Sequence, residues 1–507
     1  MKKLGFQLAA LALVATSAAP ALAQSIDEAL GLYKRKSYEE AAFAFYDVVA
    51  NDPSADNRDQ AQIYLAETLK KLDLLVPALF YYKDIFQNGG RGNRYYLNAV
   101  EGLLAVQEAL HDPIFVPSLL DNGYDPDGFA NLNPAQIAQI NYLIGELELR
   151  KNILEDAKNF LEYVPPESPS HPKARYLLGV IAVRKNKPED AMQHFKAILD
   201  LIEADTGSPD LQALRNLALI AAGRVAYGLG RFGEADSYYA QVPRYSDEWF
   251  NAMYEDAWAH FRAAGTGSPE DQAREYGKAL GDLQSVTAPF FAKRHVPEAY
   301  VIQGTTYFVN CQWDRVRRAV DRYKKVYEPM GAGLKSYLEG TRPASEYYRD
   351  VVAGGNGRFS IEVAREVRRF KRFLDYNYMI DHMAWERARI DEVKLWRGGA
   401  LVQTMTEVID GERAQLENVV GGWVKRRLRF LHDQLANFQS QINILDFEVT
   451  DAERQWLEQG KEILKGRRAR LPRPEIPNDQ WQHWSFDREF WKDEAGYFQH
   501  SLRSECF

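Results

Sequence analysis

Small and large apolar residues follow each other along residues 25–330 in a pattern that recurs. In each clear instance an Ala is followed four positions later by a large apolar residue and preceded twelve positions earlier by Gly. The instances centre on Ala157, Ala191 and Ala235, and Ala41 carries the second half of the pattern. Apolar residues three or four apart indicate amphipathic helices, and a small residue in one helix lets the next pack closely. The pattern predicts consecutive pairs of short helices.

The spacing of these instances identifies the kind of repeat. Ala157 and Ala191 are 34 residues apart, which is the period of the tetratricopeptide repeat (TPR). The segments resemble this family, and the resemblance implies an all-α superhelical solenoid whose concave groove binds peptides or protein domains. The groove residues that this layout implies lie on the first helices of the pairs: Lys34, Tyr64, Tyr142, Arg175, Asn216 and Tyr300.

Weaker matches extend the array to six or seven units. We expect N-terminal units over 24–93 and further units over 136–330, separated by a helical insertion and loop over 94–135. The loop contains three carboxylates within 121–128, but it lacks the bidentate Glu of an EF-hand. An ordinary Asx-turn loop is therefore favoured over a metal site.

Beyond the array, the apolar period over 358–468 changes to alternating steps of four and three. The strictest series covers 424–456, and such a 3.5-residue repeat places one continuous apolar seam along a helix. A weaker series covers 363–395. The two series predict a long, coiled-coil-like antiparallel hairpin that reverses between Gly398-Gly399 and Gly421-Gly422. Pairing of the seam with another chain is the alternative.

Basic residues cluster in the same region, at 365–372, 425–429 and 461–468. A solvated helix face is the simplest interpretation. The alternative is an anionic partner, either phospholipid head groups or an acidic cell-wall polymer such as peptidoglycan.

The tail over 469–507 begins with a Pro-rich stretch that cannot continue a helix. Aromatic residues follow at high density, among them Trp481, Trp484, Phe490 and Trp491. A disordered segment would not carry so many aromatics, so the tail is predicted to fold back onto the hairpin. A peptide that binds a partner is the alternative.

A narrower resemblance rests on the tail residues Trp481, Trp484-Ser485-Phe486, Glu489-Phe490-Trp491, Asp493-Glu494 and Arg503-Ser504-Glu505-Cys506. They are similar to the ending of secreted TPR proteins of the myxobacterial gliding-motility machinery. That resemblance implies an envelope component that joins inner-membrane motor parts to the outer membrane. The chain departs from the lipoproteins of such systems, because no Cys follows Ala23.

The first 23 residues predict export. Lys2-Lys3, a short apolar run and an Ala-Leu-Ala ending form a secretory signal peptide, with cleavage before Gln24. No later segment has the length of a membrane span. We therefore expect the bacterial periplasm, with association at the outer membrane open.

Two cysteines, Cys311 and Cys506, are the only thiols. An oxidising compartment would let them pair. The alternative is a buried Cys311 and a free thiol at Cys506, because sequence does not give their geometry.

Composition excludes several classes of protein. The chain is 46% hydrophobic and 26% charged, as expected of a chain that buries a core. Its formal charge of −8 argues against nucleic acid as the main partner.

No catalytic motif is present: there is no G-x-S-x-G, no P-loop, no H-E-x-x-H and no pair of His four residues apart on a helix. We expect no enzyme, cofactor or metal. The sequence predicts a periplasmic scaffold that binds other envelope proteins. The alternative is an envelope-biogenesis or peptidoglycan-binding factor that acts through the basic C-terminal helices.

Overall fold

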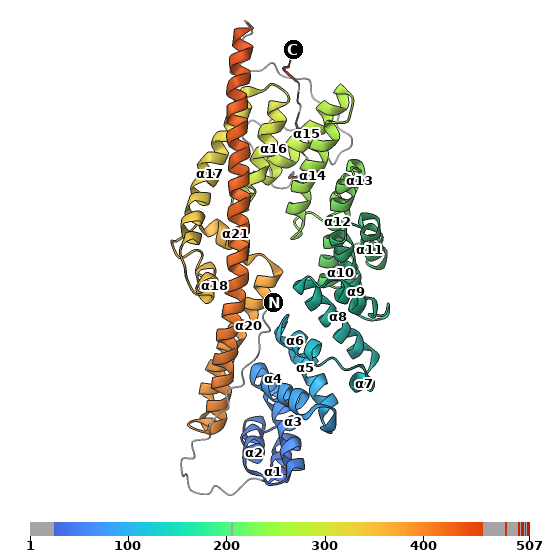
Figure 1. The fold of residues 1–507 in the computed structure, drawn as a ribbon, viewed down its shortest axis with the longest axis vertical. Helices are drawn as coiled ribbons and strands as arrows, with labels where there is room; N and C mark the ends of the chain where they lie inside the picture. Colours follow the sequence, from blue (N-terminus) through green and yellow to red (C-terminus); the bar gives the residue numbers. More distant parts are fainter. Residues whose placement is uncertain are drawn as a thin grey trace. The chain divides into compact units, whose positions relative to one another are not determined.

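The computed structural model describes residues 25–203, 206–459, 482–483, 495–496, 498–500, 502 and 504–506. Within them the chain is almost entirely α-helical (Figure 1), which confirms the predicted fold class. The exception is a parallel pair of two-residue strands, β1 (Gln482–His483) and β2 (Phe498–Gln499). None of the described helices combines the length and the apolar character that crossing a membrane requires. The signal peptide predicted over 1–23 lies outside the described residues, as do Trp481, Trp484, Phe490 and Trp491.

The chain divides into two compact units. The first comprises Met1–Val106 and Ala384–Ile409, and the second comprises Gln107–Met383 and Asp410–Phe507. Three helices pass through both units: α5 (Tyr96–Leu110), α20 (Lys371–Glu392) and α21 (Ala400–Glu458).

The first unit contains two helix pairs of the predicted kind. They are α1 (Ile26–Lys34) with α2 (Tyr38–Asn51), and α3 (Ala55–Lys71) with α4 (Leu75–Asp84). A π-helical turn (Ile85–Gly89) and a 3-10 turn (Gly90–Gly92) lead into α5. There Gly102 lies so close to the Tyr82 ring that any side chain at this position would overlap it.

Residues 384–409 belong to the same unit and pack on these pairs. The fully buried Glu386 of α20 accepts hydrogen bonds from the backbone N–H groups of Leu75 (2.6 Å) and Val76 (3.0 Å). A carboxylate at this place satisfies the free donors of the α4 N-terminus and complements its dipole. Trp396, in the 3-10 turn Lys394–Trp396, donates from Nε1 to the carbonyl oxygen of Glu39 (2.8 Å). Two side chains distant in sequence therefore hold the first repeats.

The second unit contains the regular array, drawn in green to yellow in Figure 1. Its helices are α6 (Phe115–Asn122), α7 (Pro126–Phe129), α8 (Pro134–Lys151), α9 (Leu154–Glu162), α10 (His171–Arg184), α11 (Pro188–Leu201), α12 (Pro209–Gly228), α13 (Phe232–Tyr239), α14 (Trp249–Ala264), α15 (Pro269–Val286), α16 (Pro297–Phe308) and α17 (Trp313–Glu339). From α8 onward each helix contacts the next, and each first helix also contacts the first helix of the following pair. Contacts of both kinds, within a pair and between successive pairs, are typical of a solenoid.

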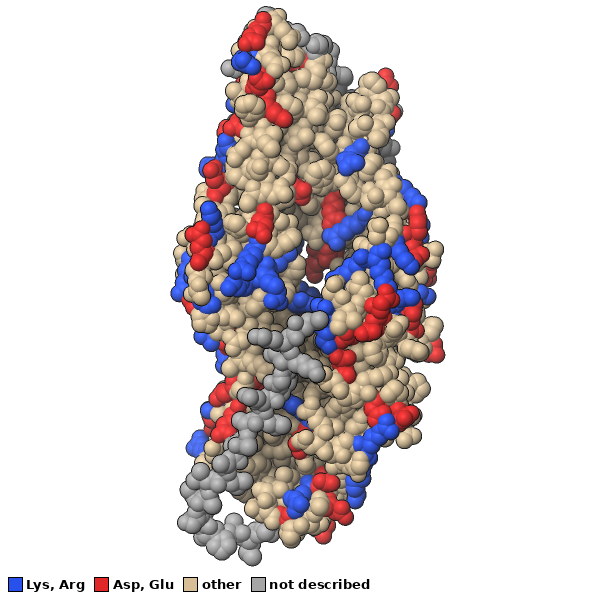
Figure 2. All heavy atoms as spheres, viewed as in Figure 1, with Lys and Arg blue, Asp and Glu red and all other residues tan. Residues whose placement is uncertain are grey.

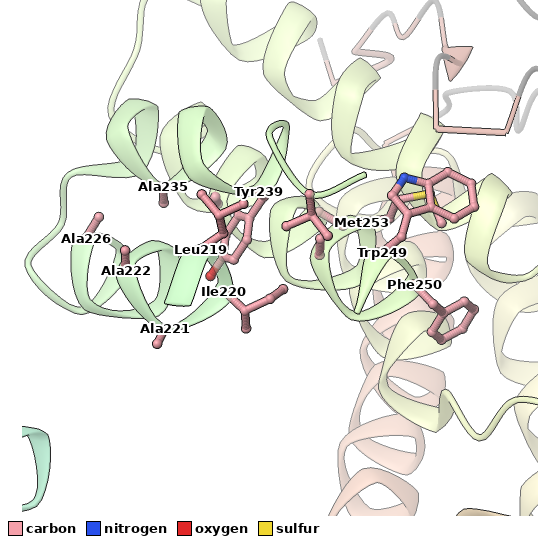
Figure 3. Packing of buried hydrophobic residues seen from close by; sticks show 14 of the residues in the cluster. Leu219, Ile220, Ala221, Ala222, Ala226, Ala235, Tyr239, Trp249, Phe250 and Met253 are labelled. Atoms are coloured by element: carbon pink, nitrogen blue, oxygen red, sulfur yellow. The ribbon is translucent and has the colours of Figure 1, made fainter. Parts of the chain in front are cut away.

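Glycine in each first helix makes the close packing within a pair possible. A Cβ on Gly179 would lie 2.5 Å from the Phe195 ring, and a Cβ on Gly223 would lie 2.5 Å from the Tyr239 ring. Figure 3 shows Tyr239 of α13 among Leu219, Ala222 and other buried residues of α12. The same core continues into α14 through Trp249 and Met253. The sequence pattern of Gly, Ala and a large residue is thus the pattern of this core.

The predicted insertion over 94–135 differs from expectation in its second half. Where a loop was expected over 111–134, the chain forms α6 and α7. The reason is Asp112, a fully buried carboxylate that accepts hydrogen bonds from the backbone N–H groups of Ile114, Phe115 and Val116 (2.7–2.9 Å) and so caps α6. In the 121–128 segment, Asp121 forms an ion pair with Lys151 (2.6 Å).

The predicted pairing of the seam was wrong. Residues 424–449 of the seam are buried as expected, but helices of the last repeat, α16 and α17, contact them. The phenol of Tyr323 donates to the carbonyl oxygen of Leu435 (3.1 Å), and Lys324 pairs with Asp446 (2.7 Å). Leu445 packs against Gly304 of α16. Helix α17 also continues to Glu339, beyond residue 330 where the array was expected to end.

The weaker series over 363–395 is only half buried. Val363 and Val367 of α19 (Ile361–Arg368) lie in the core, but Leu374 and Leu395 are 54% and 50% exposed. The buried face of α20 is instead offset by one position and begins at Phe373. An amphipathic helix with aromatic residues on two faces offers two plausible seams, and the sequence pattern selected the wrong one.

The chain reverses at the first of the two predicted limits of the hairpin turn. The chain turns at Gly398, which has a φ of 72°, and α21 then runs unbroken through Gly421 and Gly422. Gly421 is needed for close approach and not for a turn: a Cβ there would overlap the backbone of Ala344, the first residue of α18 (Ala344–Val352).

The described residues of the tail pack on the array and not on the hairpin, contrary to expectation. The backbone N–H of Gly496 donates to Ser285 Oγ (2.9 Å), and that of His500 donates to the carbonyl oxygen of Gly277 (3.1 Å), both in α15. Cys506 forms a disulfide with Cys311, at the turn between α16 and α17. Of the two alternatives for the thiols, the structure contains the bonded one.

Candidate partner-binding site

The first helices of the array share one face that does not point at their own partner helix. Relative to the packing Gly, or to Ala257 in α14, residues at −3, +1 and +4 lie on one side of a helix. Two of these residues, Leu149 and Ile220, are buried. We call the others the first-helix face: Tyr142, Glu146, Tyr176, Val180, Val183, Arg224, Tyr227, Tyr254, Trp258 and Phe261. These side chains are half-buried or exposed, and the aromatic rings among them also pack against the cores of the array.

Side-chain contacts join the first-helix face from one repeat to the next. Arg224 of α12 makes two hydrogen bonds to the carboxylate of Glu255 in α14 (2.7 and 2.5 Å), although its side chain is 58% exposed. The phenol of Tyr254 in turn donates to Glu298 of α16. Burial raises the pKa of Tyr176, and the nearby Arg224 opposes that shift. The face is therefore continuous from α10 to α16.

Helices α19 and α20 approach the two ends of this face. At the α8 end, Asp375 is close enough to Tyr142 to contribute to its raised pKa, although burial is the larger cause. The rings of His111 and Tyr378 stack there at 5.1 Å. At the other end, Glu366 of α19 interacts electrostatically with Arg294.

Three arginines of the second unit are desolvated by burial. Burial lowers the pKa values of Arg294, Arg372 and Arg427, and Glu366 is the acidic group nearest to two of them. Arg427 lies over the rings of Phe370 (4.0 Å) and Phe430 (4.6 Å). A guanidinium whose pKa falls is poorly compensated by acidic neighbours. A bound negative charge would stabilise the charged form of these arginines.

Figure 2 shows a hollow in the face that is turned to the viewer, and side chains of both charge signs border it, Lys and Arg as well as Asp and Glu. The matching view in Figure 1 has α21 on one side of it and α12 on the other. Repeat surfaces bind extended, acidic peptides where rings anchor the side chains and arginines bind the carboxylates.

The structure does not bring the six predicted groove residues together. Lys34 is exposed at the end of α1, and Tyr64 packs in the core of the first unit between the rings of Tyr33 and Phe45. Asn216 is only 7% exposed and cannot contact a partner. Arg175 lies 3.3 Å from His194.

The remaining two predicted residues are tyrosines. Tyr300 packs near the ring of Tyr327, and Tyr142 lies on the first-helix face. Residues such as Tyr176, Arg224 and Tyr254 were missed, because candidates were chosen by helix and not by their offset from the packing Gly. That offset is readable from sequence once Gly145, Gly179 and Gly223 are recognised.

Comparisons with known proteins give only distant likenesses. No protein-family model matches the sequence, and no curated protein matches it. Among solved structures, a tetratricopeptide repeat protein from Parabacteroides merdae is similar at 12% identity, with 59% of this chain and 91% of that chain covered and a TM-score of 0.25. A Rap protein complexed with competence and sporulation factor is similar at 11% identity, with 77% and 98% covered and a TM-score of 0.26. The fold of this chain, a TPR-type array with a long C-terminal helical region, therefore rests on its own geometry.

Proposed function

We propose that this protein is a non-enzymatic scaffold that binds an acidic, extended segment of a partner protein in the hollow of its second unit. The observation that carries the proposal is the row of aromatic side chains on the first-helix face, in the same unit as Arg294, Arg372 and Arg427, whose pKa values burial lowers. Repeat arrays bind through many contacts on such surfaces, and charge complementarity selects the partner.

The cellular setting is also a proposal. The N-terminal pattern supports export to the periplasm, and the tail pattern supports membership of an envelope complex such as a gliding-motility machinery. N-terminal sequencing of protein from osmotic-shock fractions should begin at Gln24. A chain that keeps Met1 in the cytoplasmic fraction would overturn the assignment, and full motility of a deletion strain would remove the gliding role.

The alternative role, binding of peptidoglycan or anionic lipid through basic helices, has less support. Several of these basic residues already have acidic neighbours on their own helix: Lys371 pairs with Asp375 (2.8 Å) and Arg369 with Glu366 (3.6 Å). The ammonium group of Lys425 lies over the Tyr347 ring (5.1 Å). Sedimentation with purified sacculi distinguishes the roles, because salt-sensitive co-pelleting of the full chain would favour the alternative.

Crosslinking in intact cells tests the scaffold directly. A photo-reactive amino acid placed at Val180, on the first-helix face, should capture a partner through an acidic segment that mass spectrometry can identify. The same amino acid at Arg454, on an exposed part of α21, is the matched control. Equal capture of the same proteins at both positions would contradict the proposed site.

A further inference from the structure

A buried cluster of ionisable side chains lies between α13, α14 and α15, away from the hollow's arginines. Asp236 belongs to α13, and Asp256 and His260 lie one turn apart on α14. One ligand atom from each of these three lies within 4.8 Å of the others. From α15, Asp282 interacts electrostatically with all three. Helices of two successive repeats thus bring three metal-binding groups together, with a fourth carboxylate nearby.

The orientation of His260 is typical of a metal ligand. The residue is 3% exposed. Its Nδ1 is 2.8 Å from Glu275 Oε2, and its Nε2 lies on the side of Asp256, 3.6 Å from Oδ2. In protein metal sites a ligating imidazole commonly donates its other N–H to a carboxylate, which fixes the ring and its tautomer.

Glu275 is itself held in place. Its Oε1 lies 3.1 Å from Arg274 Nε and 3.8 Å from Lys278 Nζ. These two cations hold the carboxylate where it orients the imidazole.

Two carboxylate oxygens in the cluster have no hydrogen-bond partner among the described residues. They are Asp282 Oδ2 and Asp256 Oδ1. Asp282 is only 6% exposed. Buried polar atoms in native proteins are nearly always satisfied. The bases beside the cluster are His260 and Lys278, whose Nζ lies 3.8 Å from both Asp236 and Glu275, and among the described residues neither donates to these two oxygens. A bound cation would satisfy both.

We propose that this cluster binds a divalent first-row transition-metal ion, such as Zn²⁺ or Mn²⁺, through Asp236, Asp256, His260 and Asp282, with Glu275 orienting the imidazole. One nitrogen and three carboxylate oxygens match these ions, whereas Ca²⁺ takes six to eight oxygen ligands. Asp236, whose side chain is 36% exposed and lies 3.8 Å from Lys278 Nζ, provides the route of entry. The ion would fasten α13 to α14 and α15.

The site was invisible to a search for His pairs. It uses Asp256 and His260 at i and i+4 on one helix, and its other ligands come from neighbouring helices. Only the fold brings them together.

The test uses the purified full chain, stripped with a chelator and then titrated separately with Zn²⁺, Mn²⁺ and Ca²⁺ by calorimetry. We expect one Zn²⁺ or Mn²⁺ ion per chain, little affinity for Ca²⁺, and a rise in Tm on binding. Co²⁺ should give a visible d–d spectrum. Asp256→Asn and Asp282→Asn should each weaken binding at least tenfold and abolish the Co²⁺ spectrum, whereas Glu270→Gln, an exposed acid on the same helix α15, should leave both unchanged.

Loss of metal binding in these variants can be distinguished from a failure to fold. Asp282→Asn replaces a buried carboxyl, one oxygen of which has no hydrogen-bond partner among the described residues, with an amide of the same shape, so the metal-free variant should melt near the Tm of the metal-free wild type. Absence of stoichiometric binding by either transition metal would overturn the proposal. Binding that Asp256→Asn and Asp282→Asn leave intact would overturn it too, since the ion would then sit elsewhere.

Discussion

The middle of the array and the C-terminal region solve the same packing problem with partners at different distances in sequence. In α12, the space above Gly223 is filled by Tyr239, sixteen residues later. In α16, the space above Gly304 is filled by Leu445 of α21, where a Cβ would lie 2.5 Å from Cδ2. The first contact is part of the repeat, whereas the second depends on a helix from the other end of the chain. Both are Gly contacts, but only the first is local.

The largest loss of stability is expected at Gly421, where helix α21 lies against the backbone of α18. Gly421→Ala should cost about 3 kcal/mol or more, because its Cβ would overlap the Ala344 backbone, which cannot rotate away. Gly422→Ala is the matched control: the nearest atom is Arg426 Nη1 at 3.8 Å, so better helix propensity should make it neutral or up to about 1 kcal/mol stabilising. Urea unfolding of the two variants measures the difference. Similar costs would mean that α18 does not cross α21 at this point.

The local contact comes next. Gly223→Ala should destabilise by about 1–3 kcal/mol, since the new methyl group would lie 2.5 Å from the Tyr239 ring. Gly228→Ala, on the same helix with no atom within 4 Å, should be neutral or slightly stabilising. Thermal unfolding would show the contrast, and a tolerated Gly223→Ala would argue against the predicted core.

A double-mutant cycle tests the distant contact. Gly304→Ala should destabilise by crowding Leu445, and Leu445→Ala should cost about 2–4 kcal/mol as a core truncation. Combined, the new methyl group fills part of the space that Leu445 leaves, so the double variant should be more stable than the sum predicts by about 1–2 kcal/mol. Additive costs would show that α16 and α21 are not in contact.

The smallest effect concerns pH at the junction of the two regions. Burial, with a smaller contribution from Arg427, lowers the pKa of His295 to about 4, and its ring lies 5.5 Å from that of Tyr327. The folded state therefore resists protonation: full stability is kept above about pH 6.5 and is lost as the pH falls toward 4. Relative to His295→Phe, the wild type should lose about 1 kcal/mol between pH 7.5 and 5.5. The free energy of unfolding is measured by denaturant titration at each pH. If it changed with pH equally in the two proteins, the lowered pKa of His295 would be refuted.

These contrasts show what the sequence could and could not predict. The Gly, Ala and large-residue spacing specified the helix pairs because each pair fills its own core within one period. The partner of the 424–449 seam was not predictable in the same way, because α17 and α20 both present apolar faces that would fit it. The helices in the second half of the insertion were not predicted. Asp112 caps α6 through three hydrogen bonds from backbone N–H groups, and such a cap leaves no periodic signal in the sequence.

The candidate site follows the same division. Tyr142 could be placed on the first-helix face from its repeat, and the offset rule would have added Tyr176 and Arg224. The arginines that face them were recognisable as basic clusters, but not as groups that approach the array, since Arg372 and Arg427 reach it only through the long C-terminal helices. The positions of arginines on these C-terminal helices depend on the whole fold and not on a local pattern.

The most direct test of the central claim is the affinity of the segment captured at Val180 for variants of two desolvated arginines of the second unit. We predict that Arg372→Gln and Arg427→Gln each weaken binding at least tenfold, and that added salt weakens wild-type binding and narrows the difference. Both variants should fold normally, because each loses a desolvated charge whose pKa burial lowers. The exposed Arg454→Gln should bind as the wild type does. Equal affinity of all four proteins would contradict the site.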